Sequence, residues 1–305
     1  MDRNSIDWYG PMPAITTPFD AEGRLDEQAL AQNIERLIGD GATGILAGGC
    51  TGEFWALSMA EKVRLTAVAR EAVAGRGPLI VCSGAITAGE TIALTEAVAA
   101  AGADGALILP PFFVRLTDDE IFGFFAEVTA KAPVPVMLYN IPGNAGNVLT
   151  PELTARLAGL DRVVAVKESS GDWDLFHGTL KATADRIRVF CGPSSVFGVA
   201  AVDHGADGTI DCFPNVWSPG GLDLYFAPLR GDGARAAALQ ETGRQLTTLF
   251  TSEGRTLYPS TKAAMELLGL PGGGPLRSPL KPLDAAQREA LAQGLAAAGL
   301  MPVPA

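Results

Sequence analysis

Short apolar runs recur along the chain and alternate with longer segments of helical periodicity. The runs cover residues 12–19, 44–49, 78–85, 105–113, 135–142, 163–169, 187–193 and 208–214. Several of them are almost uniformly apolar, which is typical of strands that are buried on both faces of a parallel sheet. The pattern therefore predicts eight parallel strands covered by helices.

The segments between these runs are predicted helices. Residues 26–39, 58–74 and 117–130 repeat apolar side chains every third or fourth position, and Thr117 precedes Glu120 with the spacing of a capping box. Eight strand–helix units at roughly 30-residue spacing predict a closed (β/α)8 TIM barrel. A doubly wound open sheet is the alternative fold.

Three similar tetrapeptides support this alternation. Gly-Ala-Thr-Gly at 41–44 and Gly-Ala-Asp-Gly at 102–105 and 205–208 each fall where a predicted helix ends and a strand begins. Glycine tolerates the left-handed backbone that closes a helix. Each tetrapeptide is therefore expected at a junction between a helix and the next strand.

Further helices are predicted after the eighth strand. Residues 218–254 and 261–268 are helical in pattern, a Pro-Gly-Gly-Gly-Pro break follows at 271–275, and residues 284–298 form a last helix. The expected organisation is a barrel core over residues 1–217, through the eighth strand, and C-terminal helices over residues 218–305 that complete and extend the barrel.

Composition narrows the range of functions. The 305 residues carry a formal net charge of −11, which opposes nucleic-acid binding. The N-terminus has no apolar signal-type segment and no run of 18 apolar residues occurs, so no membrane association and a cytoplasmic location are expected. The four cysteines form no CxxC pair and there are two histidines, so reduced thiols and no metal site are expected.

Lys167 is a candidate nucleophile because it closes the apolar run at 163–169. Barrel active sites form at the carboxyl ends of the strands, where apolar walls lower the pKa of a lysine and free its amine to attack a carbonyl. Position alone also fits a lysine that reaches solvent or pairs with a carboxylate. Glu168 should point the opposite way along an extended strand.

Two more segments place reactive groups at strand ends. The turn Gly48-Gly49-Cys50-Thr51-Gly52-Glu53 can direct main-chain N–H groups and the Thr51 hydroxyl at a small anion, or can be only a tight turn. It lacks the lysine and the spacing of a phosphate-binding P-loop. Tyr139, in Leu-Tyr-Asn-Ile-Pro-Gly, brings a phenol to the barrel mouth or packs in the core.

Taken together, the Gly-x-Thr-Gly-Glu turn, the Tyr-Asn-x-Pro-Gly strand end and the Lys-Glu-Ser-Ser-Gly-Asp segment resemble the dihydrodipicolinate synthase / N-acetylneuraminate lyase family of pyruvate-dependent class I aldolases. The resemblance runs through nearly the whole chain. It implies that Lys167 forms a Schiff base with the substrate, that Tyr139 relays protons, and that Thr51 holds the carboxylate. It also implies a homotetramer and no cofactor beyond the covalent Schiff base.

Substrate binding is expected to involve Gly49 and Cys50 beside Thr51, together with Ile210 of the eighth run. The chain departs from the synthase pattern at three positions. Phe113 stands where those synthases carry a second relay tyrosine, Asn144 where they carry a carboxylate-binding arginine, and Cys50 where Thr or Ser is usual. A phenyl ring relays no proton, and the loss of an arginine weakens recognition of a second carboxylate.

These features predict a Schiff-base lyase that acts on a 2-oxo-3-deoxy sugar acid or a similar 2-oxo acid, by retro-aldol cleavage or by dehydration. The alternatives are 4-hydroxy-tetrahydrodipicolinate (dihydrodipicolinate) synthase and a non-catalytic 2-oxo acid binding protein. Polar loop residues that the sequence alone does not position are Ser169, Ser170, Asp172, Asp211, Asn215 and Arg115.

Overall fold

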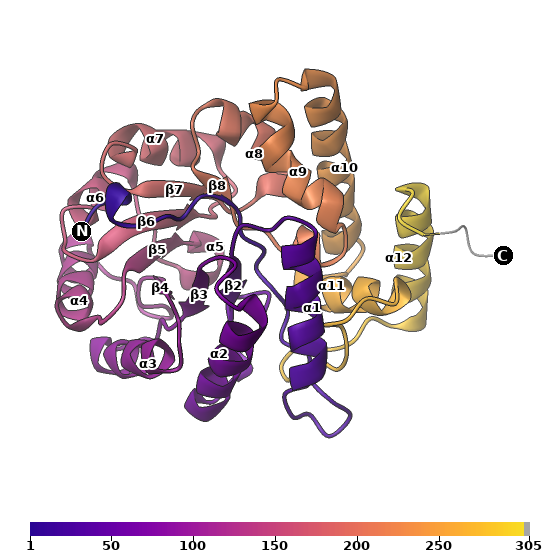
Figure 1. Cartoon of the computed structure of the whole chain (residues 1–305), viewed down its shortest axis with the longest axis horizontal. Coiled ribbons are helices and arrows are strands. Elements are labelled where there is room, and N and C mark those ends of the chain that lie inside the picture. The colour runs from indigo at the N-terminus through magenta and orange to yellow at the C-terminus, as the bar shows by residue number, and fades with distance from the viewer. Residues whose placement is uncertain (302–305) are drawn as a thin grey trace.

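The computed structural model describes residues 1–301, which form a closed (β/α)8 barrel (Figure 1). The parallel strands are β1 (Gly10–Pro11), β2 (Ile45–Ala47), β3 (Leu79–Cys82), β4 (Gly105–Ile108), β5 (Val136–Asn140), β6 (Val163–Glu168), β7 (Arg188–Cys191) and β8 (Gly208–Thr209). Strands β2 to β8 pair in chain order, and β8 pairs with β1. The ring closes where Ala14, beyond β1, bridges Leu46 of β2. The predicted fold class is confirmed.

Helices surround this sheet, and α9 to α12, which follow the last strand in the chain, pack beside the barrel (Figure 1). They are α1 (Glu27–Gly39), α2 (Met59–Val73), α3 (Ala88–Ala100), α4 (Asp118–Lys131), α5 (Pro142–Ala145), α6 (Pro151–Leu157), α7 (Trp173–Thr183), α8 (Ser194–Asp203), α9 (Ser218–Leu229), α10 (Gly233–Thr251), α11 (Leu257–Leu267) and α12 (Ala285–Ala297). Short 3-10 turns occur at η1 (Arg3–Ser5), η2 (Phe54–Ala56) and η3 (Phe213–Asn215).

Local sequence signals set the helix ends. Thr117 caps α4 and Glu120 reaches back to its backbone, as the spacing predicts. At the helix-to-strand junctions, Gly41, Gly102 and Gly205 have φ angles of 106°, 105° and 101°, which favour glycine. The three repeated tetrapeptides therefore begin at the glycines that end α1, α3 and α8.

Apolar side chains form separate layers inside and outside the barrel. In β5, Val136 and Leu138 pack outward against the surrounding helices, while Met137 and Tyr139 point into the barrel interior. Alternation along β5 therefore carries Tyr139 into the barrel. Trp8 also lies in the interior, so close to Gly105 that a Cβ there would overlap the indole ring.

An irregularity between β5 and β6 sets the orientation of the lysine strand. Val136 pairs with Val163, but the next residue, Met137, pairs with Ala165, so one extra residue lies in β6. Such a bulge leaves two consecutive side chains on one side of the strand. From Ala165 the strand then alternates, which directs Lys167 inward beside Tyr139.

The first apolar run was placed too late in the chain. We expected a strand over residues 12–19, whereas β1 is Gly10–Pro11 and the run beyond it makes only two isolated bridges, from Ala14 to Leu46 and from Phe19 to Leu25. Pro13 and Pro18 interrupt this run, and proline donates no hydrogen bond to a ladder. The eighth run is also shorter than expected, because β8 spans only Gly208–Thr209.

A buried ion pair ties the C-terminal helices to the turn after β2. Lys262 of α11 lies with its Nζ 2.6 Å from Glu53 Oε1, and both side chains are buried. The Arg277 main-chain N–H donates to Glu53 Oε2 at 2.9 Å, and the Lys262 amine donates to the Pro275 carbonyl at 2.8 Å. The extension therefore holds the backbone of a barrel-mouth turn through Glu53.

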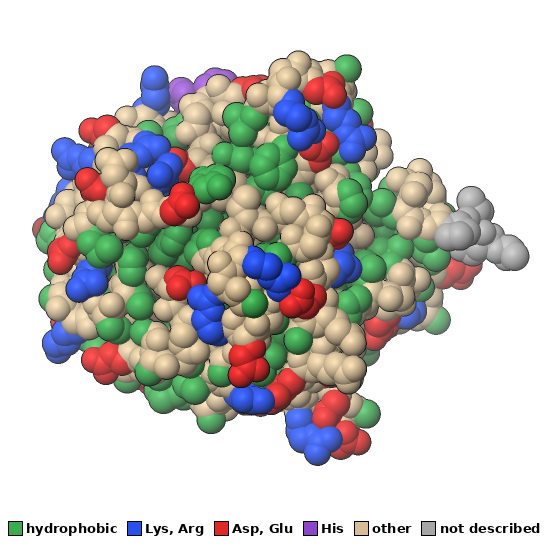
Figure 2. Space-filling view, in the orientation of Figure 1, with side chains coloured by type: hydrophobic (Ala, Val, Ile, Leu, Met, Phe, Trp, Pro, Cys, Tyr) green, Lys and Arg blue, Asp and Glu red, His purple; other side chains and the backbone are tan. Residues whose placement is uncertain are grey.

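The visible surface mixes charges of both signs. On the face shown in Figure 2, basic and acidic side chains lie interspersed, with histidine at the upper edge. Within residues 1–301, the helices are too short or too polar to cross a membrane.

We expect Lys262→Met to lower the free energy of unfolding by about 3 kcal/mol or more, because it leaves the Glu53 carboxylate buried without its cation. Urea unfolding followed by circular dichroism measures the change. The matched control is Lys281→Met at an exposed lysine. Adding Glu53→Gln to Lys262→Met should recover part of the lost stability. Equal stability of the Lys262→Met and Lys281→Met variants would contradict the expectation.

Candidate active site

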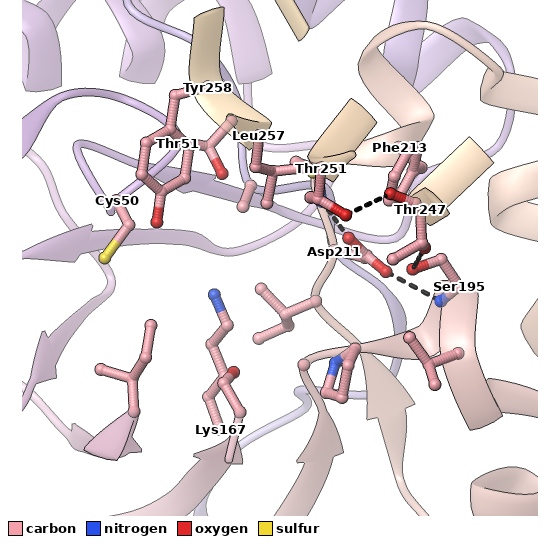
Figure 3. A pocket seen from close by; sticks show the side chains of 18 of the residues that line it. Cys50, Thr51, Lys167, Ser195, Asp211, Phe213, Thr247, Thr251, Leu257 and Tyr258 are labelled. Carbon is pink, nitrogen blue, oxygen red and sulfur yellow. Dashed lines mark hydrogen bonds between the residues drawn. The ribbon is translucent and has the colours of Figure 1, made fainter. Parts of the chain in front are cut away.

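A cavity of about 180 Å³ opens at the carboxyl ends of the strands. Its floor carries Lys167, and its walls come from the turn after β2, the loop after β8 and the helices α8, α10 and α11 (Figure 3). In Figure 3 the Lys167 amine points upward, with Cys50 and Tyr258 to one side and Asp211 to the other. The barrel fold thus collects groups that are far apart in the sequence.

Lys167 is buried at the end of β6, where it pairs in register with Tyr139 on one side and Phe190 on the other. Its Nζ lies 4.5 Å from the centroid of the Tyr139 ring. Burial lowers the pKa of Lys167, and the nearby Cys50 and Asp211 oppose this shift only in part. A larger fraction of neutral, nucleophilic amine follows from this environment.

Glu168 lies on the other side of the strand, as alternation predicts. Its Oε1 accepts hydrogen bonds from Asn140 Nδ2 at 3.0 Å and the Ser170 main-chain N–H at 2.8 Å, and Oε2 accepts from Ser170 Oγ at 3.0 Å. Burial raises the pKa of Glu168 to about 7 despite these donors. The carboxyl therefore anchors the loop after Lys167 outside the cavity.

The turn after β2 supplies Cys50 and Thr51 to the cavity wall. The Tyr139 hydroxyl donates to Cys50 Sγ at 3.7 Å. Within the described chain, the main-chain N–H groups of Cys50 and Thr51 have no acceptor, which leaves them available to an anion. Gly49 does not line the cavity, and its carbonyl accepts from the Gly52 N–H at 3.0 Å within the turn.

Tyr258 of α11 brings a second phenol to the cavity that the sequence did not indicate. Asn144 Nδ2 lies 3.5 Å from the Tyr258 hydroxyl and 3.8 Å from Cys50 Sγ. Burial raises the pKa of Tyr258 and that of Tyr139, so both phenols stay protonated. Phe113, in contrast, is 92% exposed and has a φ of 77°.

The opposite side of the cavity carries Asp211 and hydroxyl groups. Asp211 Oδ2 accepts from the Ser195 main-chain N–H at 2.9 Å and from Ser194 Oγ at 3.2 Å. Thr247 Oγ1 of α10 lies 3.0 Å from Ser195 Oγ. Thr251, one helical turn beyond Thr247, also lines the cavity.

The remaining candidate residues separate into two groups. Ile210 and Ser169 line the cavity, and a Cβ at Gly192 would overlap Ser169 Oγ. The others make structural contacts elsewhere: Ser170 with Glu168, Asp172 at the N-terminus of α7, Asn215 with the Ala14 carbonyl, and Arg115 with the Gly146 carbonyl.

In the described part of the chain, no three His, Cys, Asp or Glu side chains lie close enough together to bind a metal ion. His177 of α7 and His204 at the end of α8 do come together, with ring centroids 5.3 Å apart. Their sequence spacing gave no indication of this pairing. All four cysteines are buried and unbridged.

A β/α barrel with a buried lysine amine at its mouth is suited to carbonyl chemistry through an imine. Residues 7–298 match the Dihydrodipicolinate synthetase family. The "Uncharacterized DapA-like lyase" of Rhizobium meliloti is 32% identical, with 88% of each chain covered. The 4-hydroxy-tetrahydrodipicolinate synthase of Synechococcus sp. (strain CC9311) is 34% identical, with 94% of each chain covered.

The chain belongs to the dihydrodipicolinate synthetase family and is a lyase of the class I aldolase type. Among solved structures, YagE, a prophage protein from E. coli K12 in complex with pyruvate, has a TM-score of 0.92 and 27% identity, covering 97% of this chain and 100% of that one. Dihydrodipicolinate synthase from Acinetobacter baumannii complexed with pyruvate has a TM-score of 0.89 and 28% identity, covering 96% and 99%. The resemblance seen in the sequence motifs is confirmed.

The raised pKa of Glu168 makes stability depend on pH. The folded protein keeps a proton that the unfolded chain releases near its usual pKa of 4.5, so the free energy of unfolding falls as pH rises from about 4.5 to about 7. This group contributes up to about 3 kcal/mol of the change.

Glu168→Gln should flatten that part of the profile, because a glutamine carbonyl can accept from Asn140 and Ser170 N–H while its amide faces Ser170 Oγ. Urea unfolding at a series of pH values measures the slope. The exposed Glu152→Gln serves as control. An unchanged slope in Glu168→Gln would refute the assignment.

Proposed function

We propose that Lys167 forms an imine with the C2 carbonyl of a 2-oxo acid, and that the substrate is a 2-oxo-3-deoxy sugar acid or a close analogue. The observation that carries the proposal is the buried Lys167 amine, which lies over the Tyr139 ring at the base of a cavity. An amine with a lowered pKa attacks a carbonyl at neutral pH. The two similar structures solved with pyruvate support the same substrate class.

The chemistry follows from the imine. The Lys167 amine adds to C2, and loss of water gives a protonated imine that withdraws electrons from C3. In retro-aldol cleavage the C4 hydroxyl loses its proton, the C3–C4 bond breaks, and its electron pair forms an enamine while an aldehyde leaves. Protonation at C3 and hydrolysis then release pyruvate. In dehydration, C3 loses a proton and C4 loses its hydroxyl, so no pyruvate forms.

The other cavity residues take roles that this chemistry requires. Tyr139, which donates to Cys50 Sγ, transfers protons near the imine. The C1 carboxylate is held by the N–H groups of Cys50 and Thr51 and by the Thr51 hydroxyl, with Gly49 shaping the turn. Ile210 forms an apolar wall beside Lys167. The imine serves as the electron sink, so the reaction uses no metal or organic cofactor.

The synthase reaction is the second candidate, because many relatives, including that of Synechococcus sp. (strain CC9311), bear that name. Two features of this chain favour the sugar acid. Asn144 stands where the synthase pattern has an arginine, and Phe113 offers no hydroxyl. A non-catalytic 2-oxo acid binding protein is the remaining alternative.

Borohydride reduction in the presence of pyruvate tests the proposal. We expect a reduced pyruvyl adduct on Lys167, located by peptide mass spectrometry, and its loss in Lys167→Ala. Lys181→Ala, at an exposed position of α7, should keep the adduct, and EDTA should leave its yield unchanged.

The products then discriminate among the candidates. A sugar-acid panel that yields pyruvate identifies an aldolase, and a deoxygenated oxo acid without pyruvate identifies a dehydratase. Condensation of pyruvate with aspartate semialdehyde identifies the synthase. Pyruvate binding without turnover supports the binding protein, and a folded protein that forms no adduct with pyruvate or longer 2-oxo acids contradicts the imine.

We also propose that the chain assembles into a homotetramer in the cytoplasm. Exposed apolar side chains at Trp55, Met59, Ile86, Phe113 and Val114 provide contact surface. Light scattering coupled to size exclusion should give four times the 31.6 kDa chain mass. Phe113→Glu should lower that mass, whereas a monomeric wild-type protein would contradict the proposal.

A further inference from the structure

Asp211 places a fixed negative charge on one side of the active-site cavity. The N–H groups of Ser195 and Cys212 donate to it at 2.9 and 2.6 Å, and Ser194 Oγ donates at 3.2 Å. Ser194 and Ser195 form the first turn of α8, where the helix end favours a carboxylate. A carboxylate offers about four acceptor sites, so capacity remains for a hydroxyl from a ligand.

Helix α10 holds this part of the cavity rigid. Residue Phe197 interrupts the helical geometry of α8, and Gln240 of α10 bonds across the interruption. Its Oε1 accepts from the Val199 N–H at 2.9 Å, and its Nε2 donates to the Ser195 carbonyl at 2.8 Å. A Cβ at Gly243 would lie 2.7 Å from that same carbonyl, so α10 packs directly on the Ser195 backbone. Asp211 is therefore fixed by a supported scaffold.

Neutral hydroxyls line the same cavity as Asp211. Ser195 and Thr247 contact each other, and Thr251 lies one turn farther along α10. Ser169 Oγ is buried and has no hydrogen-bond partner among the described residues. A buried hydroxyl without a partner favours a ligand that supplies one.

Positive charge, in contrast, is confined to one group. Lys167 is the only cationic side chain among the described residues that line the cavity. Under the proposed function, its charge resides on the imine and the substrate's C1 carboxylate lies at the Cys50–Thr51 turn. The distal part of the substrate then extends toward Asp211, across the cavity from Cys50 in Figure 3.

We propose that Asp211 is a specificity residue that selects 2-oxo acids with a neutral, hydroxylated distal end and rejects those that carry a second carboxylate or a phosphate there. The hydroxyls of such a chain donate to Asp211 and pair with Ser169 and Ser195. An anionic end meets the Asp211 carboxylate with no cation to offset the repulsion. This inference rests on the proposed imine at Lys167.

Imine trapping compares two substrates without requiring turnover. The probes are 2-oxo-3-deoxygluconate and the same chain with C6 oxidised to a carboxylate, each competing with pyruvate for reduction onto Lys167. We expect wild-type protein to trap the neutral-ended acid at least about tenfold better, a ratio equivalent to about 1.4 kcal/mol. Asp211→Asn should remove most of this preference, while Asp203→Asn, at the far end of α8, should keep it.

A second pair of variants tests the charge argument without altering Asp211. Thr251→Lys adds a cation at the exposed edge of the cavity and should increase trapping of the dicarboxylic acid at least about tenfold. Thr251→Met, of similar length and without charge, should not.

The outcomes separate this inference from the proposed function. Absence of a pyruvate adduct on Lys167 overturns both. Three results overturn the role of Asp211 alone, provided that the pyruvate adduct is normal. They are equal trapping of the two sugar acids, trapping of neither acid, and a preference for the neutral-ended acid that survives Asp211→Asn and does not change in Thr251→Lys.

Discussion

The architecture of the site depends on the burial of one ammonium group. Lys167 lies among the side chains of the barrel interior, where Tyr139 and Phe190 flank it and little of its surface is exposed. Removing a charge from water is costly unless the group is paired or loses its proton. No carboxylate forms an ion pair with Lys167 in the described chain, so its environment favours the neutral amine. The Glu53–Lys262 pair shows the other outcome, because there a buried lysine retains a carboxylate partner.

The C-terminal helices belong to the site as well as to the fold. The sequence suggested an extension beyond the barrel, yet α10 and α11 place Thr247, Thr251 and Tyr258 on the cavity wall. The Glu53–Lys262 pair joins α11 to the turn that carries Cys50 and Thr51. Barrel and C-terminal helices therefore determine the geometry of the cavity together.

The sequence predicted the features that depend on neighbouring residues. The capping box at Thr117 and the junction glycines were recognisable because their physical causes lie within a few positions. Strand alternation predicted that Lys167 and Glu168 point to opposite sides of the strand. The motifs likewise indicated Tyr139, Cys50 and Thr51 as groups near the lysine, although their roles remain proposals.

Contacts between segments that are far apart in the chain could not be predicted from the sequence. Helical periodicity identifies the buried face of α10 but not its partner, so the contact between Thr247 and Ser195 had no local signal. The same is true of Tyr258, whose hydroxyl approaches Asn144 across 114 residues. Asp211 was visible as a polar loop residue, but its position depends on the first turn of α8.

The extra residue in β6 has a consequence for how this barrel can change. Val164 and Ala165 both face the barrel interior, so the bulge absorbs the extra residue before the alternation that directs Lys167 inward begins. Losing one residue between Ala165 and Lys167, in contrast, would turn the amine outward and bring the carboxylate of Glu168 into the cavity. The strand can therefore change its length at the bulge, whereas the two steps from Ala165 to Lys167 set which charge enters the cavity.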